Sequence, residues 1–138
     1  MWNNESMKIE HRDINFEDAR GAITDVFVGT PKEHCTIITT KKGGVRGNHY
    51  HQKSQQSDFV VSGSFKIYSQ KVGEEKVQEA VIKTNDYVTW DTNEVHEFVA
   101  QEDSVFITFV NGPRGGDDFE KDTFRVSVPL HELFEKQA

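Results

Sequence analysis

Residues 43–63, with the sequence GGVRGNHYHQKSQQSDFVVSG, contain the pattern that decides how this chain is interpreted. His49 and His51 are two positions apart, so on a β-strand both imidazoles project from the same face. On a strand that faces the interior of a barrel, two ring nitrogens at this spacing can converge on one small object, either a metal ion or a substrate. We therefore expect the functional site around His49 and His51.

Short β-type segments separated by turn residues extend on both sides of this pattern. Residues 65–70 alternate with a period of two, which is typical of a half-buried strand. Further strands are predicted at residues 22–28, 35–40, 45–51, 59–62, 77–83, 87–90, 95–100 and 105–110, with an edge strand at 123–128. After Pro129, the spacing of Leu130, Leu133 and Phe134 predicts a short C-terminal helix.

These elements define the expected fold class. Roughly nine or ten short strands, with no alternation of strands and helices, predict an all-β antiparallel sandwich or barrel. The length of 138 residues fits a single domain over residues 1–138, with the barrel core at about 20–128. His96 lies on a later predicted strand, from which it can reach the cavity of the histidine pair if the strands close into a barrel.

The composition narrows the class of partner. The formal net charge of −7 argues against nucleic acid and anionic membrane as main partners. No run approaches the roughly 18 apolar residues of a membrane helix, and no signal peptide is recognisable, so the cytoplasm is the expected compartment. The single cysteine, Cys35, excludes an internal disulfide and is predicted to pack as a small hydrophobic residue.

The histidine pair is part of a larger motif. Gly43, His49, His51, Gln56 and Gly63 resemble the first motif of the cupin family, with glutamine where that motif usually has glutamate. Residues 85–100 resemble the second cupin motif more weakly, because only its histidine, at position 96, is kept. The resemblance implies a cupin double-stranded β-helix, that is, a jelly-roll barrel.

A narrower resemblance concerns the activity. The string Arg46-Gly47-Asn48-His49-Tyr50-His51, with Gln56 and residues 62–64, is similar to the nucleotide-linked sugar 3,4-ketoisomerases of bacterial glycan biosynthesis. Residues 18–24 also resemble the start of those proteins and of related sugar 3,5-epimerases. In that family a glutamine replaces the glutamate of metal-binding cupins. The resemblance implies metal-free acid–base chemistry on a nucleotide-linked keto-sugar, with the paired histidines in the pocket.

The residue types suit this chemistry. Histidine has an unperturbed pKa of about 6.5, so His49 and His51 can act as catalytic base and acid near neutral pH. Gln56 can orient an imidazole or bind a sugar oxygen, and Arg46 can meet a diphosphate or a developing enediolate. Arg46, Gln56 and His96 are therefore the expected substrate-binding residues.

Two alternatives remain open. The chain can be a metal-dependent cupin enzyme, a dioxygenase or an isomerase, in which His49, His51 and His96, with or without Gln56, bind Fe, Mn, Ni or Zn. It can also be a non-catalytic small-molecule-binding cupin, which the incomplete second motif permits. A homodimer is expected in either case, because small open β-sheets protect their edge strands by pairing.

Other residues are assigned by their context. Tyr50 alternates to the opposite face from the histidines and is predicted to pack, while Tyr68 and Tyr87 are weaker pocket candidates. Residues 114–116, an arginine and two glycines, are expected to form a loop. The remaining histidines, His11, His34 and His131, are expected at the surface.

Overall fold

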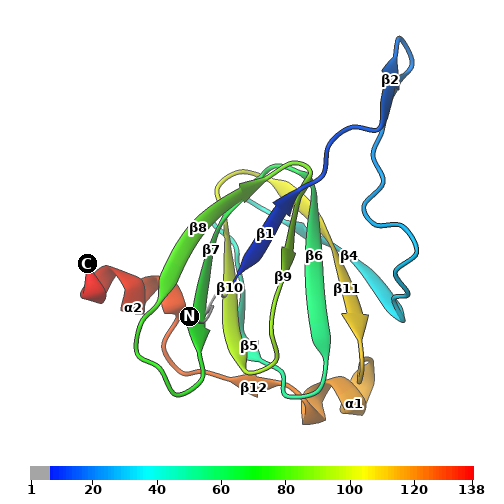
Figure 1. The fold of residues 1–138 in the computed structure, drawn as a ribbon. Helices are drawn as coiled ribbons and strands as arrows, with labels where there is room; N and C mark the ends of the chain where they lie inside the picture. The colour runs from blue at the N-terminus through cyan, green and yellow to red at the C-terminus, as the bar shows by residue number, and fades with distance from the viewer. Residues whose placement is uncertain (1–6) are drawn as a thin grey trace, which may run out of the picture.

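The computed structural model describes residues 7–138, which fold into two facing antiparallel sheets (Figure 1). The first sheet has the order β1 (Lys8–His11), β9 (Asp86–Thr89), β6 (Gln55–Ser62), β11 (Ser104–Asn111) and β4 (His34–Thr40). The second has the order β12 (Phe124–Arg125), β5 (Val45–Tyr50), β10 (Glu94–Ala100), β7 (Ser64–Lys71) and β8 (Gln78–Lys83). The predicted all-β jelly roll is confirmed.

Alternating side chains of the two sheets fill the space between them. Phe98 of β10 contacts both Phe65 and Phe106, with ring centroids 5.6 Å and 4.7 Å away. Each of these three rings is almost completely buried, and burying a phenylalanine stabilises a fold by roughly 1.5–3 kcal/mol. This apolar cluster also forms one wall of the cavity described below.

The helix α2 (Leu130–Gln137) covers the outer face of the second sheet. Leu130 is fully buried, and Leu133 and Phe134 pack against the same cluster, so the predicted helical spacing is confirmed. Side chains of the sheet cap its first turn: Asn48 accepts a hydrogen bond from the Leu130 N–H at 2.9 Å, and Glu97 accepts one from the His131 N–H at 2.7 Å.

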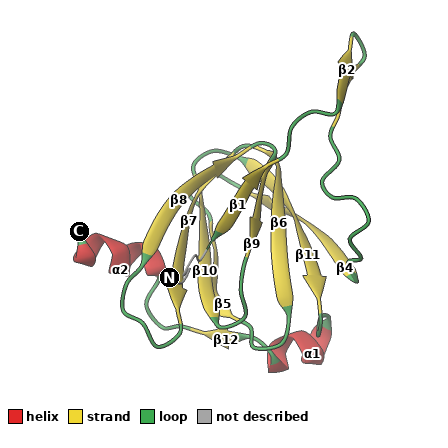
Figure 2. Ribbon diagram, viewed as in Figure 1, coloured by secondary structure: helices red, strands yellow, loops and turns green. Residues whose placement is uncertain are grey.

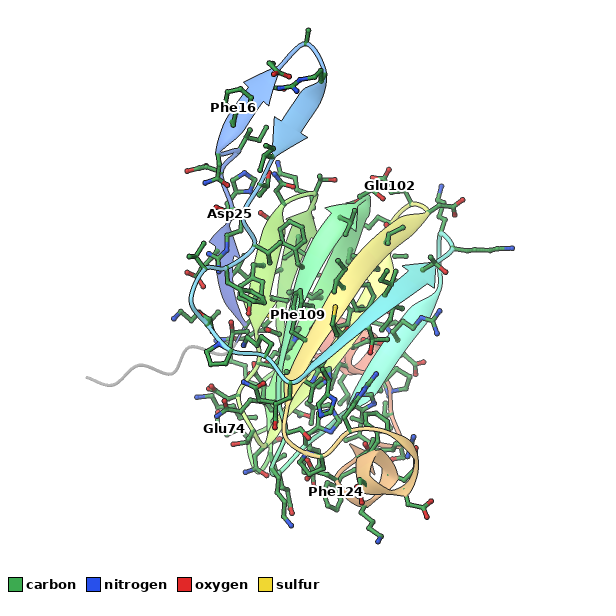
Figure 3. The ribbon with its side chains drawn as sticks, turned by 90° about the vertical axis from the view of Figure 1, so that its right-hand side faces the viewer. Phe16, Asp25, Glu74, Glu102, Phe109 and Phe124 are labelled. Atoms are coloured by element: carbon green, nitrogen blue, oxygen red, sulfur yellow. The ribbon has the colours of Figure 1, made fainter. Side chains whose placement is uncertain are left out.

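A two-stranded arm extends away from the barrel (Figures 1 and 3). It consists of β2 (Phe16–Asp18) and β3 (Gly21–Ile23), and all six residues are exposed. The predicted strand at 22–28 is wrong beyond residue 23. Val26 and Phe27 instead turn back to pack beside Tyr87, which breaks the extended pairing.

Several further expectations need correction. The strands β1 and β2 were not predicted from the sequence. Cys35 is exposed, because β4 lies at a sheet edge and its alternate residues face outward. The expected loop at 114–116 leads directly into a short helix, α1 (Gly116–Lys121), and only Phe124–Arg125 of the predicted edge strand pairs with β5. His131, expected at the surface, binds the buried Glu97 carboxylate at 2.7 Å.

Helices are a minor part of the fold (Figure 2). Within residues 7–138, no helix has the length and apolar character needed to cross a membrane.

Candidate functional site

Three histidines meet between the sheets. His49 lies on β5, His51 directly follows that strand, and His96 lies opposite His49 on the neighbouring β10. The ring centroids are 5.0 Å apart for His49 and His51, 4.8 Å for His49 and His96, and 5.6 Å for His51 and His96. One nitrogen from each ring falls within 4.8 Å of the others. The structure thus brings together the three histidines that the sequence singled out.

Local backbone geometry allows this approach. The pairing of β10 with β5 is irregular between His96 and Glu97, where β10 faces Gly47. Gly47 has a φ of +96°, and a Cβ at this position would lie 2.4 Å from the carbonyl oxygen of His96. A residue with a side chain would therefore push the two strands apart next to the histidines.

Hydrogen bonds determine the tautomers of two of the rings. Nδ1 of His51 lies 2.8 Å from the carbonyl oxygen of Asp122, and Nδ1 of His96 lies 3.3 Å from that of Glu94. A carbonyl oxygen only accepts, so both Nδ1 atoms carry a proton, and in a neutral ring Nε2 then keeps the lone pair. Nε2 of His96 is buried and has no hydrogen-bond partner among residues 7–138.

Burial keeps the rings neutral. Loss of solvent lowers the pKa of His49 to about 4, with further contributions from His51 and Arg125. Burial also lowers the pKa of His96 well below its usual value. At neutral pH both side chains are therefore free to accept a proton or to bind a metal ion.

Asp122 holds the loop that follows β5. Its carboxylate accepts backbone hydrogen bonds from Gln52 at 3.0 Å, Lys53 at 3.1 Å and Ser54 at 2.8 Å. Burial acts to raise the pKa of Asp122, but these hydrogen bonds together lower it below its usual value. Because its carbonyl also binds His51, Asp122 fixes both the loop and the imidazole. Sequence analysis did not single out this residue, which is distant from His51 in the chain.

A cavity of about 170 Å³ opens beside the histidines. Its lining comprises Ile38, Arg46, Gly47, His49, Gln56, His96, Phe98, Phe106, Thr108, Arg114 and Phe119. One part of the wall is apolar, and the rest carries imidazoles, an amide, a hydroxyl and two guanidinium groups. His51 is not among the lining residues, although its ring contacts those of His49 and His96.

Two arginines border this cavity. Arg46 is exposed and donates to the carbonyl oxygen of Thr39 at 2.8 Å, and it also lines a larger open groove of about 710 Å³. Arg114 lies over the ring of Phe119, 4.7 Å from its centroid. Arg114, expected from the sequence to lie in a loop, lines the cavity, and Phe119 of the following helix α1 packs near His49 and His51.

Gln56 borders the cavity and contacts a buried carboxylate. Asp58 is 0% exposed and accepts hydrogen bonds from Thr108 Oγ1 at 2.6 Å, Trp90 Nε1 at 2.8 Å and Gln56 Nε2 at 3.0 Å. Burial raises the pKa of Asp58 to about 6. The indole of Trp90 in turn stacks on His96, with 5.1 Å between centroids. Asp58 was not identified from the sequence, since nothing in its local pattern distinguishes it.

The tyrosines lie outside the cavity. Tyr68 donates to Glu79 at 2.6 Å and packs near α2, while Tyr87 donates to Ser57 at 2.6 Å. Neither is among the residues that line the cavity. Tyr50 stacks on Phe124 at 5.2 Å, which confirms its packing role.

The donor set fits a divalent metal ion. Three imidazoles with converging nitrogens, one of them a buried Nε2 without a partner among residues 7–138, are a common arrangement for zinc or iron with open positions for substrate. The amide oxygen of Gln56 is a possible fourth ligand on the same cavity.

Solved structures with the same fold include enzymes of nucleotide-sugar chemistry. The dTDP-4-dehydrorhamnose 3,5-epimerase from Sulfolobus tokodaii aligns with a TM-score of 0.72 and 19% identity over 89% of this chain and 83% of its own. The sugar 3,4-ketoisomerase QdtA from Thermoanaerobacterium thermosaccharolyticum aligns with a TM-score of 0.71 and 17% identity over 95% and 93%. At these identities the likeness shows the fold.

The capsular polysaccharide assembling protein CapF from Staphylococcus aureus is 26% identical, with a TM-score of 0.61, over 85% of this chain. The chain spans about a third of CapF, since the match covers 34% of that protein. No curated protein sequence matches the chain.

One protein family covers most of the sequence. Residues 16–124 match the family described as the polysaccharide biosynthesis C-terminal domain. This range includes the three histidines, Gln56, both cavity arginines and Asp122. The chain therefore belongs to the polysaccharide biosynthesis C-terminal domain family and is built on a cupin jelly roll.

Proposed function

We propose that this protein is an isomerase or epimerase that moves a proton next to the ketone of a nucleotide-linked keto-sugar in bacterial glycan biosynthesis. One observation carries the proposal: neutral imidazoles with free nitrogens lie at a cavity that two arginines border. The names of similar structures, a 3,5-epimerase and a 3,4-ketoisomerase, support the same reaction class.

His49 and His51 are the proposed proton carriers. In a 3,4-ketoisomerisation a histidine removes the proton from C3 of a 4-keto-sugar, and the electrons form an enediolate across C3 and C4. A proton is then added to C4, and the C3 hydroxyl loses its proton as the new ketone forms. An epimerisation returns the proton to the opposite face of the same carbon.

The arginines balance the charge that develops. Arg114 lines the cavity and stabilises the negative charge on the enediolate oxygen. Arg114 and Arg125 contribute to the low pKa of His49, so an anionic substrate that neutralises them raises this pKa and makes His49 a stronger base.

The volumes support a nucleotide-linked substrate. A cavity of about 170 Å³ has room for a sugar ring but not for a whole nucleotide. Arg46 lines both this cavity and the groove of about 710 Å³, which supports a role for Arg46 in binding a diphosphate between the sugar and the nucleoside. Gln56 and His96 complete the proposed substrate contacts.

The proposal assigns no cofactor, with a metal-dependent enzyme as second candidate. The partnerless Nε2 of His96 and the converging nitrogens favour this second candidate. His49, His51 and His96 would hold the ion, with the Gln56 amide oxygen as a further ligand. A divalent ion bound there would supply Lewis acidity that polarises the ketone.

An exchange experiment tests the proposal. The protein is incubated with a nucleotide-linked 4-keto-6-deoxysugar in deuterated water, and incorporation of deuterium at C3 or C4 is the expected result. His49→Gln and His51→Gln are expected to abolish the exchange, whereas His34→Gln, on β4, is the matched control. Ligand binding without exchange would indicate a non-catalytic binding protein.

Metal analysis separates the two candidates. On the metal-free proposal, exchange persists after dialysis against a chelator. Stoichiometric Fe, Mn, Ni or Zn that disappears in the His49→Ala/His51→Ala double variant would contradict it and support the metal-dependent enzyme.

Three further expectations belong to this proposal. The protein functions as a homodimer, for which the exposed arm β2–β3 and the unpaired edge of β4 offer surfaces to a second copy. Residues 1–138 act as a single domain, and the working compartment is the cytoplasm.

A further inference from the structure

The side chain of Gln56 lies between the cavity and the buried carboxylate of Asp58. Nε2 of Gln56 is 3.0 Å from Oδ2 and 3.4 Å from Oδ1 of Asp58. Gln56 lines the cavity together with His49 and His96, whereas Asp58 does not. One residue therefore presents its amide to two different environments.

The other donors to Asp58 determine which end of the amide faces it. Trp90 Nε1 can only donate, and it does so to the same Oδ2 atom at 2.8 Å. Thr108 donates to Oδ1 at 2.6 Å. A carboxylate that accepts from these groups repels a carbonyl oxygen, so the NH₂ end of Gln56 faces Asp58. The amide oxygen, Oε1, receives no hydrogen bond from residues 7–138 and is the end left for the cavity.

We propose that Asp58 is a positioning residue, which orients the amide of Gln56 so that its carbonyl oxygen, and not its NH₂ group, faces the cavity lined by His49 and His96. The cavity then receives a neutral oxygen acceptor, able to bind a sugar hydroxyl or a cation. Without the hydrogen bond to Asp58, the Gln56 amide could rotate, and in a fraction of the molecules its NH₂ group would face the cavity. This donor group would repel any cation near the imidazoles.

This arrangement also accounts for a glutamine at position 56. A glutamate there would place two carboxylates in hydrogen-bond contact inside the barrel, which is unfavourable unless they share a proton. With glutamine at position 56, the negative charge is carried by Asp58, which does not line the cavity, and its effect on the cavity is to orient the Gln56 amide. The inference rests on the proposed function, since it concerns the same cavity, but its test measures orientation and ion affinity, not turnover.

The orientation is measured first in the unaltered protein by NMR. The side-chain NH₂ signals of Gln56 are identified by their loss in Gln56→Glu. We expect a nuclear Overhauser cross-peak between this NH₂ group and Nε1–H of Trp90, because both donate to the same oxygen, together with slow exchange with water. Absence of the cross-peak with rapid exchange of the NH₂ hydrogens would overturn the inference.

Variants then test the consequence. Asp58→Leu removes both acceptors at similar volume, whereas Asp58→Asn keeps one oxygen that can still accept from Gln56 and Trp90. Cobalt(II) serves as the probe ion, with binding followed by its absorption spectrum. We expect Asp58→Leu to weaken cobalt binding by roughly 10–100-fold, the usual effect of losing a residue that orients a ligand. Asp58→Asn should restore most of the affinity.

Tyr87→Phe is the matched control. It removes a buried hydrogen bond from Tyr87 to Ser57, which is the next residue after Gln56 on β6. This hydrogen bond lies outside the cavity. Its cobalt affinity should equal that of the unaltered protein. Equal affinity in Asp58→Leu would contradict the proposal. If Asp58→Leu does not fold, or the unaltered protein takes up no cobalt, the cross-peak between Gln56 and Trp90 decides. If the unaltered protein shows the cross-peak between Gln56 and Trp90 but exchanges no deuterium into the sugar, the result contradicts the proposed function and leaves this inference standing.

Discussion

His96 lies directly opposite His49 in the antiparallel pairing of β10 with β5, and the two rings meet edge to face with centroids 4.8 Å apart. Both residues are therefore held by the hydrogen-bonded ladder of a sheet and not by a loop. The irregular pairing beside them requires a glycine at position 47, because a Cβ there would collide with the His96 carbonyl oxygen. The geometry of the site thus depends on the backbone at one glycine.

Gly47→Ala is expected to destabilise the protein and to abolish activity together. The new Cβ would lie 2.4 Å from the His96 carbonyl oxygen, in a backbone conformation with positive φ. The conformation alone costs roughly 1–2 kcal/mol for a residue with a side chain. Gly73→Ala is the matched control, because Gly73 has a φ of +90° but no atom within 4 Å of the added Cβ. Urea denaturation should show a larger loss for position 47; equal losses would contradict the role of the close contact.

Asp122→Ala is expected to loosen the loop after β5. Three backbone N–H groups lose their acceptor, and the buried one, that of Ser54, costs about 1–3 kcal/mol when it is left without a partner. Since the pKa of Asp122 is lower in the folded protein than its usual 3.8, its contribution is complete above pH 3.8 and disappears as the pH falls through the lowered value. Denaturation curves of the two proteins should therefore differ at pH 7 and converge in strong acid. A difference that is the same at every pH would show that the carboxylate is not responsible.

Glu97→Ala is expected to release α2 from the sheet. The buried carboxylate accepts from Asn48 at 2.8 Å and from His131 through both its ring and its backbone. Hydrogen bonds to charged groups contribute about 1.5–3 kcal/mol each, so the loss should exceed that of an ordinary surface substitution. Glu97→Gln keeps one acceptor and should lose less. Amide hydrogen exchange of residues 130–137 measures the effect, and unchanged protection in Glu97→Ala would contradict it.

The arm is expected to hold two copies together. A two-stranded hairpin is marginally stable on its own, and the apolar Phe16 and Ile23 are 51% and 58% exposed (Figure 3). Light scattering should give the mass of a dimer, and Phe16→Ser/Ile23→Ser should give a monomer with the same circular dichroism spectrum of the barrel. A monomeric unaltered protein would overturn the prediction.

Much of the fold and part of the site can be predicted from the sequence. Period-two alternation identifies most barrel strands, since each strand has one face toward the core. The spacing of His49 and His51 predicts their common direction, because it depends only on strand geometry.

The remaining site residues depend on contacts between distant parts of the chain. Asp58 becomes a ligand-orienting candidate only because Trp90 and Thr108 converge on it. Arg114 lines the cavity beside Phe119, a contact that the sequence pattern does not predict. Cys35 illustrates the same limit: its β-branched neighbours predict a strand, but not that this strand lies at an edge with one face open.

The position of Asp122 in the chain has a consequence for biosynthesis. The strands β1 to β11 all precede it, so a ribosome synthesises every strand of the two sheets except β12 before it adds the carbonyl that orients His51. Phe119, which packs against both His49 and His51, also belongs to this late segment. A nascent chain can therefore assemble its barrel first and acquire a competent histidine cluster only afterwards, which delays any chemistry until folding is nearly finished.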